Sequence, residues 1–159
     1  MKKIILLVAL VTVSLVNAQA YKGAGDVKAQ VGANIQKGGT GIVLSSDFGI
    51  GENMSYGFVA SYLLSVPSDI EVKFEDKIDL KARFNANLGN VLKLDPKMDV
   101  YPGLDLSLRN FGAHLGFRYF FTDGFGLFSE FGIPIAKYKS DGNLNNNQFV
   151  FNVGASFNL

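Results

Sequence analysis

Cysteine and tryptophan are both absent from the 159 residues, and the chain contains one histidine and four prolines. Without cysteine the chain forms no disulfide and carries no cysteine-linked lipid. Charged residues are scarce as well, at 18% against roughly 25% in an ordinary soluble domain. The formal net charge of +1 provides no basic stripe of the kind that nucleic-acid binding requires. These absences exclude a disulfide scaffold and a lipoprotein, and we expect no nucleic-acid partner.

Long apolar runs are also missing, except at the N-terminus. Two lysines precede an apolar run over residues 4–16, and small residues stand at Ala18 and Ala20. A basic start, a short apolar centre and small residues near the cut are typical of a secretory signal peptide. The alternative, a membrane anchor, would need ~20 apolar residues to span. We predict a signal peptide over 1–18, with cleavage after residue 20 as the alternative, and a single domain over 19–159.

The end of the chain, Asn147 to Leu159, alternates apolar and polar side chains. One parity is apolar and consists of Phe149, Phe151, Val153, Ala155, Phe157 and Leu159. This period of two is that of a β-strand with one apolar and one polar face. A terminal edge strand this apolar would invite aggregation unless the sheet closes on itself.

The same alternation recurs along the chain and predicts eight strands. They cover 27–36, 42–50, 54–66, 78–88, 98–108, 111–121, 126–135 and 147–159. Pro102 falls inside the fifth, where its missing N–H predicts a β-bulge. A membrane protein without a spanning helix must be a closed barrel, because every backbone N–H and C=O needs a partner in hydrocarbon. The predicted fold is therefore all-β, an eight-stranded antiparallel up-and-down transmembrane β-barrel.

The two faces of the predicted strands differ in chemistry. The apolar face carries most of the aromatic side chains, as a lipid-facing surface would. The polar face would line the lumen with a network of five acids, four bases and the histidine: Lys28, Asp47, Asp79, Lys81, Arg83, Asp99, Asp105, His114, Arg118 and Glu130. This near balance suits internal pairing, because lone charges in a narrow interior are costly. Eight strands enclose a lumen that side chains can fill, so we expect a plug and not a pore.

The terminal strand resembles the C-terminal strand of bacterial outer-membrane barrels, in which a polar residue, a glycine, an aromatic and a terminal hydrophobe act as an assembly signal. Those positions are held here by Asn152, Gly154, Phe157 and Leu159. With its leader, alternation and turns, the whole mature chain resembles the small outer-membrane β-barrel family, the OmpX-like and OmpA-barrel-like porin-family proteins. The resemblance implies a Gram-negative bacterium, export through the periplasm, insertion by the barrel-assembly machinery, and a monomer surrounded by outer-membrane lipid and lipopolysaccharide.

Members of that family serve as adhesion or surface-interaction proteins, envelope stabilisers or small channels. We therefore expect a structural or surface-interaction role, with a surface ligand at the charged loop 67–77 or the Asn-rich loop 137–147. The main alternative is a narrow channel for ions or small solutes. A soluble lipocalin-like binding barrel fits less well, because its exterior should be rich in Lys and Glu, and the polar face is rich in Gly, Ser and Asn instead.

Catalytic or metal chemistry finds little support in the sequence. His114 could act as the general base of a lipid-modifying outer-membrane enzyme, but its parity points inward and Ser107 is the only hydroxyl near it in sequence. Asp141, Asn143 and Asn145 begin like a calcium loop, yet the glycine at the sixth position and the closing glutamate are missing. We expect no enzymatic activity, no cofactor and no metal site.

Overall fold

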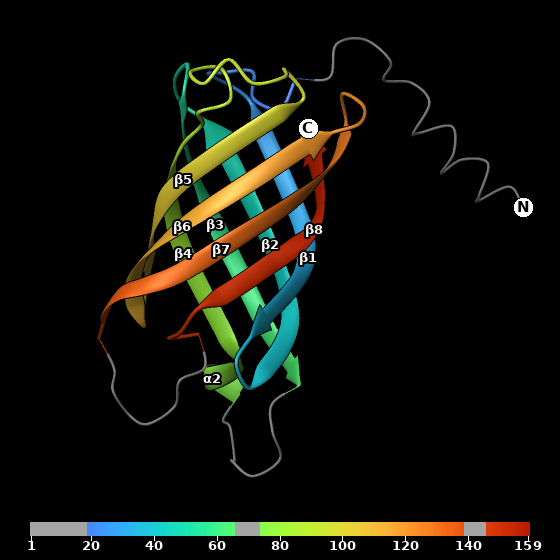
Figure 1. The fold of residues 1–159 in the computed structure, drawn as a ribbon. Coiled ribbons are helices and arrows are strands. Elements are labelled where there is room, and N and C mark those ends of the chain that lie inside the picture. The colour runs from blue at the N-terminus through green and yellow to red at the C-terminus, as the bar shows by residue number, and fades with distance from the viewer. Residues whose placement is uncertain (1–18, 66–73, 139–145) are drawn as a thin grey trace, which may run out of the picture.

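Eight antiparallel strands close into a barrel, with β8 pairing back to β1 (Figure 1). The structure is a computed structural model, and it describes residues 19–65, 74–138 and 146–159. The predicted eight-stranded, all-β, up-and-down barrel is confirmed. Its strands are β1 (Val27–Gln36), β2 (Gly39–Gly49), β3 (Met54–Ser65), β4 (Ile78–Ala86), β5 (Met98–Ser107), β6 (Asn110–Phe120), β7 (Phe125–Lys137) and β8 (Val150–Asn158). The predicted signal peptide, residues 1–18, lies outside the described residues.

The barrel has two unlike ends. At the first, which we call the terminal end, lie residues 19–26 and Leu159 (Figure 1). At the opposite end, the loop end, a short helix α2 (Phe74–Lys77) leads into β4. The connections at the terminal end are 50–53, 87–97 and 121–124, and those at the loop end are 37–38, 66–77, 108–109 and 138–149. Successive connections therefore alternate between the two ends, as the sequence predicted.

The seam between the first and last strands removes every free sheet edge. It runs from the Lys28–Asn158 pair to the Gln36–Val150 pair. Each strand thus has a hydrogen-bonded neighbour on both sides. A wall of this kind can lie in hydrocarbon, because its backbone donors and acceptors are satisfied within the sheet.

One local prediction is wrong, since there is no bulge at Pro102. Pro102 stays in regular register opposite Leu115 of β6. The ladder between β4 and β5 ends at the adjacent Gly103, so the missing N–H lies at the margin of that ladder, where proline is tolerated. The register shifts that the structure does contain lie at Thr40/Gly41 in β2 and at Phe111/Gly112 in β6.

The wall is apolar outside and polar inside. Phe58 and Leu80 point outward and are 59% and 58% exposed, whereas Lys28 and Asp47 point inward and are each 1% exposed. A water-soluble barrel has the reverse arrangement, so the lipocalin-like alternative does not fit this wall. None of the helices among the described residues is long and apolar enough to cross a membrane.

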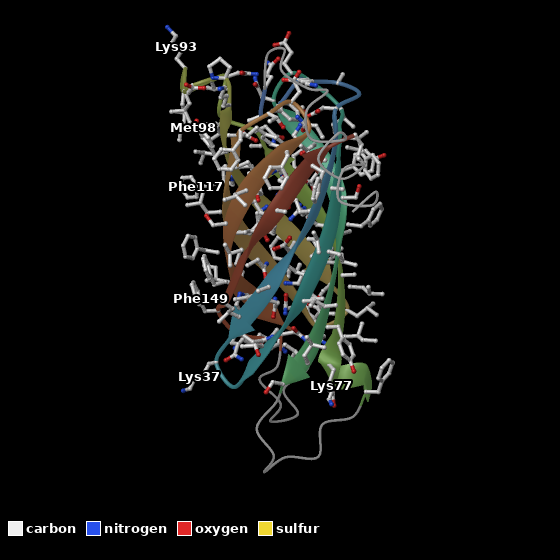
Figure 2. The ribbon with its side chains drawn as sticks, turned by 90° about the vertical axis from the view of Figure 1, so that its right-hand side faces the viewer. Lys37, Lys77, Lys93, Met98, Phe117 and Phe149 are labelled. Atoms are coloured by element: carbon white, nitrogen blue, oxygen red, sulfur yellow. The ribbon has the colours of Figure 1, made fainter. Side chains whose placement is uncertain are left out.

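Aromatic side chains gather on the outer surface near the terminal end. The Phe48 and Tyr56 rings stack with centroids 5.4 Å apart, and the Tyr119 and Phe121 rings meet edge to face at 5.2 Å. Other outward side chains follow the wall along its length, as Met98, Phe117 and Phe149 show (Figure 2). This arrangement is the interfacial girdle expected for a transmembrane barrel, built without tryptophan.

Candidate functional site

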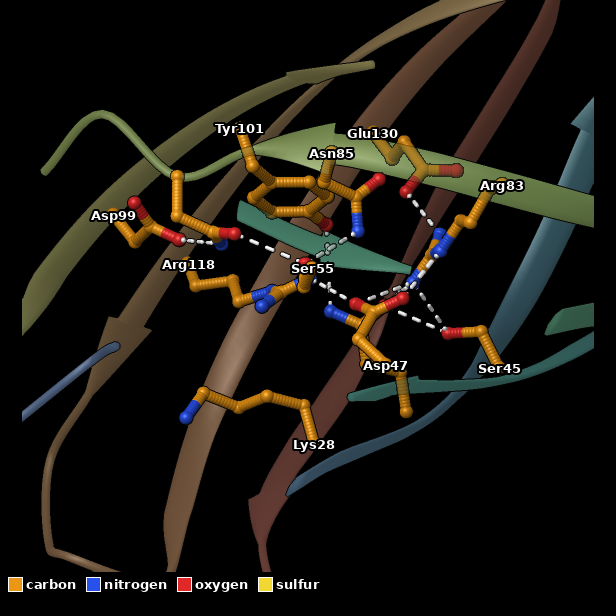
Figure 3. A network of polar contacts seen from close by, with 12 residues as sticks. Lys28, Ser45, Asp47, Ser55, Arg83, Asn85, Asp99, Tyr101, Arg118 and Glu130 are labelled. Carbon is orange, nitrogen blue, oxygen red and sulfur yellow. Dashed lines mark hydrogen bonds and ion pairs between the residues drawn. The ribbon is translucent and has the colours of Figure 1, made fainter. Parts of the chain in front are cut away.

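The middle of the lumen is spanned by an ion-pair network centred on Arg83 of β4 (Figure 3). Its Nε donates to Asp47 Oδ1 at 2.6 Å and its Nη2 to Asp47 Oδ2 at 2.8 Å. On the other side, Nη1 donates to Glu130 Oε2 of β7 at 2.9 Å. The bidentate pair with Asp47 is the strong geometry for an arginine and a carboxylate. All three side chains are buried, so the network joins three strands across the lumen.

A second arginine and a tyrosine complete this central layer. Arg118 of β6 donates from Nη2 to Asp47, and its guanidinium carbon lies 3.8 Å from the centre of the Tyr101 ring. The Tyr101 hydroxyl accepts a hydrogen bond from Gln30 Nε2 at 3.3 Å. Tyr101 is fully buried. It is not among the residues predicted for the lumen network, although it has the same strand parity as Asp99 and Asp105.

The terminal end of the lumen is covered by residues 19–26, which the sequence analysis left unassigned. The Tyr21 hydroxyl donates to the Gly51 and Met54 carbonyls at 2.9 and 2.6 Å. Burial, followed by the negative charges of Asp26 and Asp99, raises the pKa of Tyr21 to about 12. These bonds attach the segment to the β2–β3 turn, so it forms a lid over the barrel.

Lys28 lies directly beneath this lid, where its charge is paired with a carboxylate. It forms an ion pair with Asp26, and its Nζ lies 5.4 Å from the centre of the Phe120 ring and 6.0 Å from that of Tyr21. A cation between two rings and a carboxylate is well satisfied despite its burial. Phe120 is itself fully buried, which closes this end with apolar bulk.

Asp99 is held by hydrogen bonds and not by a cation. Its Oδ2 accepts from Asn87 Nδ2 at 2.8 Å, and its Oδ1 accepts from the Gly89 backbone N–H at 3.0 Å. Asn87 in turn accepts from the Ser55 hydroxyl at 2.9 Å. Charge-assisted hydrogen bonds of this kind satisfy a buried carboxylate.

The His114 ring lies between an amide and a carboxylate. One ring nitrogen, Nε2, lies 2.9 Å from Asn85 Oδ1, and the other, Nδ1, lies 3.0 Å from Asp105 Oδ1. Neither nitrogen faces a serine hydroxyl in the described part of the chain. His114 and Asp105 are both buried, so the residue has no access to lipid from this position.

The remaining predicted lumen residues, Asp79 and Lys81, lie towards the loop end. They form a looser pair at 3.6 Å, and the Lys81 side chain is 18% exposed. A small cavity beside Lys81 and Asp105 has a volume of about 10 Å³, which holds about one water molecule. The structure therefore places all ten predicted residues in the lumen. Asn85 donates to the Ser55 hydroxyl at 3.1 Å, which joins the His114–Asp105 contacts to those of Asp99, while Lys28 pairs with Asp26 and Lys81 with Asp79.

The mouth at the loop end is closed by the last residues of the loop before β8. Asn146 is 3% and Asn147 5% exposed. The Asn146 N–H donates to Gln36 Oε1 at 2.8 Å, and Asn110 Nδ2 donates to the Asn146 carbonyl and to Asn147 Oδ1, both at 2.8 Å. The interpretation of 137–147 as a surface loop is therefore wrong for these two asparagines. It is also wrong for Lys137, which ends β7.

Other parts of the two predicted ligand loops, 67–73 and 139–145, fall outside the described residues. Among the described residues, no group of three or more His, Asp or Glu side chains could hold a metal ion.

The four residues of the predicted assembly signal occupy different environments. Asn152 lies in the lumen, accepts from Asn34 Nδ2 at 2.8 Å and donates to Glu130 Oε1 at 3.2 Å. Phe157 lies on the outer wall, 5.7 Å from the Phe125 ring. Leu159 is 82% exposed at the terminal end. Their role in assembly stays a prediction.

The remaining member of that signal, Gly154, is needed where the barrel closes. It lies opposite Gly32 in the β1–β8 ladder. A Cβ on either glycine would overlap the backbone of the opposite strand. The two strands therefore approach closely at this seam because neither residue has a side chain.

Comparison with known proteins agrees with this architecture. A designed protein from work on the de novo design of transmembrane β-barrels superimposes with a TM-score of 0.59 at 10% identity, covering 87% of this chain and 98% of the other. Outer membrane protein G from Pseudomonas aeruginosa, solved by NMR, gives a TM-score of 0.49 at 13% identity, covering 87% and 99%. No curated protein matches the chain. By its match to the designed protein, the fold is that of the transmembrane β-barrels.

Residues 11–159 match the model of a family of unknown function, DUF6646, and the chain belongs to that family. The family description assigns no activity, and an OmpX-like relationship is not among these matches.

Proposed function

We propose that this protein is an integral outer-membrane barrel with a sealed lumen, which acts as a structural or surface-interaction protein and not as an enzyme or an open pore. The carrying observation is the central layer, where Arg83 bridges Asp47 and Glu130 while Arg118 stacks on Tyr101. Residues 19–26 cover one end of this layer and Asn146 and Asn147 the other. A solute would have to displace paired, buried charges to pass.

The asymmetry of the two ends supports a location in the outer membrane. Barrels of that membrane have short periplasmic turns and longer outer loops. Here the two longest connections, 66–77 and 138–149, share the loop end. We therefore propose that the loop end faces outward and that the protein is exported, inserted by the barrel-assembly machinery, and present as a monomer among lipopolysaccharide and phospholipid.

The surface-interaction role would use the loop end. Phe74 of α2 is 68% exposed there and lies against Tyr62 with ring centroids 5.9 Å apart. Lys77 ends α2 and Lys137 ends β7 at the same end, where Arg109 forms an ion pair with Asp76 at 3.3 Å. An end that combines cations with apolar groups could contact an anionic surface ligand.

Gel mobility of the membrane fraction, compared between boiled and unboiled samples, tests insertion. A closed barrel resists detergent in the cold and changes apparent mass on heating. Protein found in the soluble fraction without such a shift would contradict the proposal.

Conductance in planar bilayers tests the sealed lumen. We expect no steady openings from the natural protein. The double variant Tyr101→Ala/Arg118→Ala removes the central stack and should conduct, provided that its heat-dependent mobility shows a folded barrel. The matched control Lys137→Ala/Tyr138→Ala changes exposed residues at the loop end and should stay silent. Steady openings of the natural protein would favour the narrow channel instead.

A further inference from the structure

The connection between β4 and β5, residues 87–97, is long for the terminal end and has a fixed conformation. Its neighbours, 50–53 and 121–124, are much shorter. Within it, the Leu92 N–H donates to the Leu88 carbonyl at 2.8 Å and the Leu94 N–H to the Gly89 carbonyl at 3.0 Å. We call this segment the β4–β5 turn. Its two ends already have roles, since Asn87 and Gly89 hold Asp99 and the Pro96 carbonyl accepts from Ala20, but these contacts do not explain the exposed tip.

The tip of the β4–β5 turn exposes apolar side chains beside a lysine. Val91 is 55% and Leu92 54% exposed, and Lys93 follows with φ +52°. Figure 2 shows Lys93 at the terminal end, on the same side of the barrel as the outward-facing Met98 and Phe117. The apolar tip thus adjoins the lipid-facing wall at the start of β5.

A polar cleft adjoins this tip. It has a volume of about 520 Å³ and lies between the N-terminal segment, the β2–β3 turn and the β4–β5 turn. Lys22, Glu52, Asn53, Asn90 and Val91 are among the residues that line it, so a cation and a carboxylate both border the cleft. Cations therefore stand on both sides of the apolar pair, Lys22 across the cleft and Lys93 along the chain.

We propose that the β4–β5 turn is an interfacial anchor that binds phospholipid. Val91 and Leu92 insert among the upper acyl segments, while Lys22 and Lys93 contact lipid phosphates, with a head group in the cleft. Apolar groups at the boundary with cations beside them are what an anionic lipid interface recognises. Continuity with the lipid-facing wall selects lipid over a soluble partner or a second copy. The inference rests on the proposed membrane location.

The absence of tryptophan makes a direct test possible. Leu92→Trp introduces a single indole, whose emission and quenching are measured in vesicles containing phosphatidylglycerol and lipids brominated at different depths. We expect a blue-shifted emission, quenched at least twofold more strongly by bromines near the head group than by deep ones. A water-like emission without quenching would overturn the proposal, and the tip would then be free for a soluble partner or a second copy.

Two further single-tryptophan variants separate the possible failures. Phe58→Trp lies on the middle of the outer wall and should be quenched by deep bromines. If it is not quenched, the proposed membrane location is contradicted, and so is the anchor that depends on it. Asp123→Trp lies in the β6–β7 turn at the same end, outside the residues that line the cleft. If it is quenched as strongly as Leu92→Trp, the signal reflects the affinity of indole itself, and the anchor is overturned.

The role of the cations is tested in the Leu92→Trp background. Lys22→Gln/Lys93→Gln should shift the emission towards the red and weaken shallow quenching about twofold. Lys37→Gln/Lys137→Gln removes two exposed lysines at the loop end and should change neither. Equal effects of the two pairs, or no effect of the first, would remove phosphate binding from the proposal.

Discussion

Tyr101 lies opposite Gly116 in the β5–β6 ladder, and its ring fills the space in which a Gly116 side chain would stand. The stacking of Arg118 on that ring depends on this vacancy. The Tyr101 ring of β5 thus packs against β6 at a position where β6 has no side chain.

Gly116→Ala should therefore destabilise the barrel, because the added Cβ would overlap the Tyr101 ring. Overpacking of this kind costs about 1–3 kcal/mol. The folded fraction across a urea series, measured as the heat-modifiable gel band, would report it. Gly132→Ala is the matched control, since it also points inward but has no atom nearer than 4.0 Å to the new Cβ. Equal midpoints for the two variants would contradict the packing argument.

Arg83→Met should cost more, because it removes the bidentate partner of Asp47 and the cation that pairs with Glu130 in a buried layer. Breaking a buried ion pair from one side costs about 3–5 kcal/mol. The same urea series measures the loss. Lys137→Met, at an exposed position, should have almost no effect. A small effect at Arg83 would mean that water reaches this layer.

The lid formed by residues 19–26 should loosen in alkali. The pKa of Tyr21 is raised to about 12 from an ordinary value of 10.0. The folded state therefore holds its phenol proton more tightly, and the stabilisation is complete below pH 10 and is lost as the pH rises towards 12. Stability measured from pH 9 to 12 should fall less steeply in Tyr21→Phe than in the natural protein. Parallel curves would show that the lid does not depend on this proton.

The two predicted cleavage sites differ in what they leave in this lid. Ala20 is fully buried, and its N–H donates to the Pro96 carbonyl at 2.7 Å. Cleavage after residue 18 keeps these contacts, whereas cleavage after residue 20 removes them. We predict that the mature protein starts at Gln19, which mass spectrometry of the purified chain can determine. A mature chain that starts at Tyr21 would contradict this.

The strands of the wall could be predicted from the sequence, whereas the segments that cover the two ends of the lumen could not. Strands such as β1 and β6 carry strict alternation, and the period of two fixes which side chains face the lumen. The lid at 19–26 and the closing residue Asn146 at the loop end lie in segments without alternation of apolar and polar residues. They are held by single hydrogen bonds to distant residues, such as that from the Asn146 N–H to Gln36. A local sequence pattern does not predict hydrogen bonds between residues so far apart in the chain.

Pairing within the lumen could not be predicted for a related reason. Alternation shows that Arg83 and Arg118 both point inward, but which carboxylate each reaches depends on the stagger of eight strands. In the structure both contact Asp47, while Asp99 has amide and backbone partners instead. For Pro102 the sequence predicted a bulge that the structure does not contain. The prediction considered only the missing N–H of proline, and the end of the β4–β5 ladder at Gly103 cannot be read from the sequence.

The seam between β1 and β8 also constrains how the molecule can form. Lys28 pairs with Asn158, so the closing contacts join the two ends of the domain. Contacts of such long sequence separation form late, after a large loss of chain entropy. Until the final strand arrives, β1 remains an open edge able to pair with another chain. The growing chain must therefore be kept apart from its copies until it is complete, and a chain shortened by one strand should aggregate and not fold into a smaller barrel.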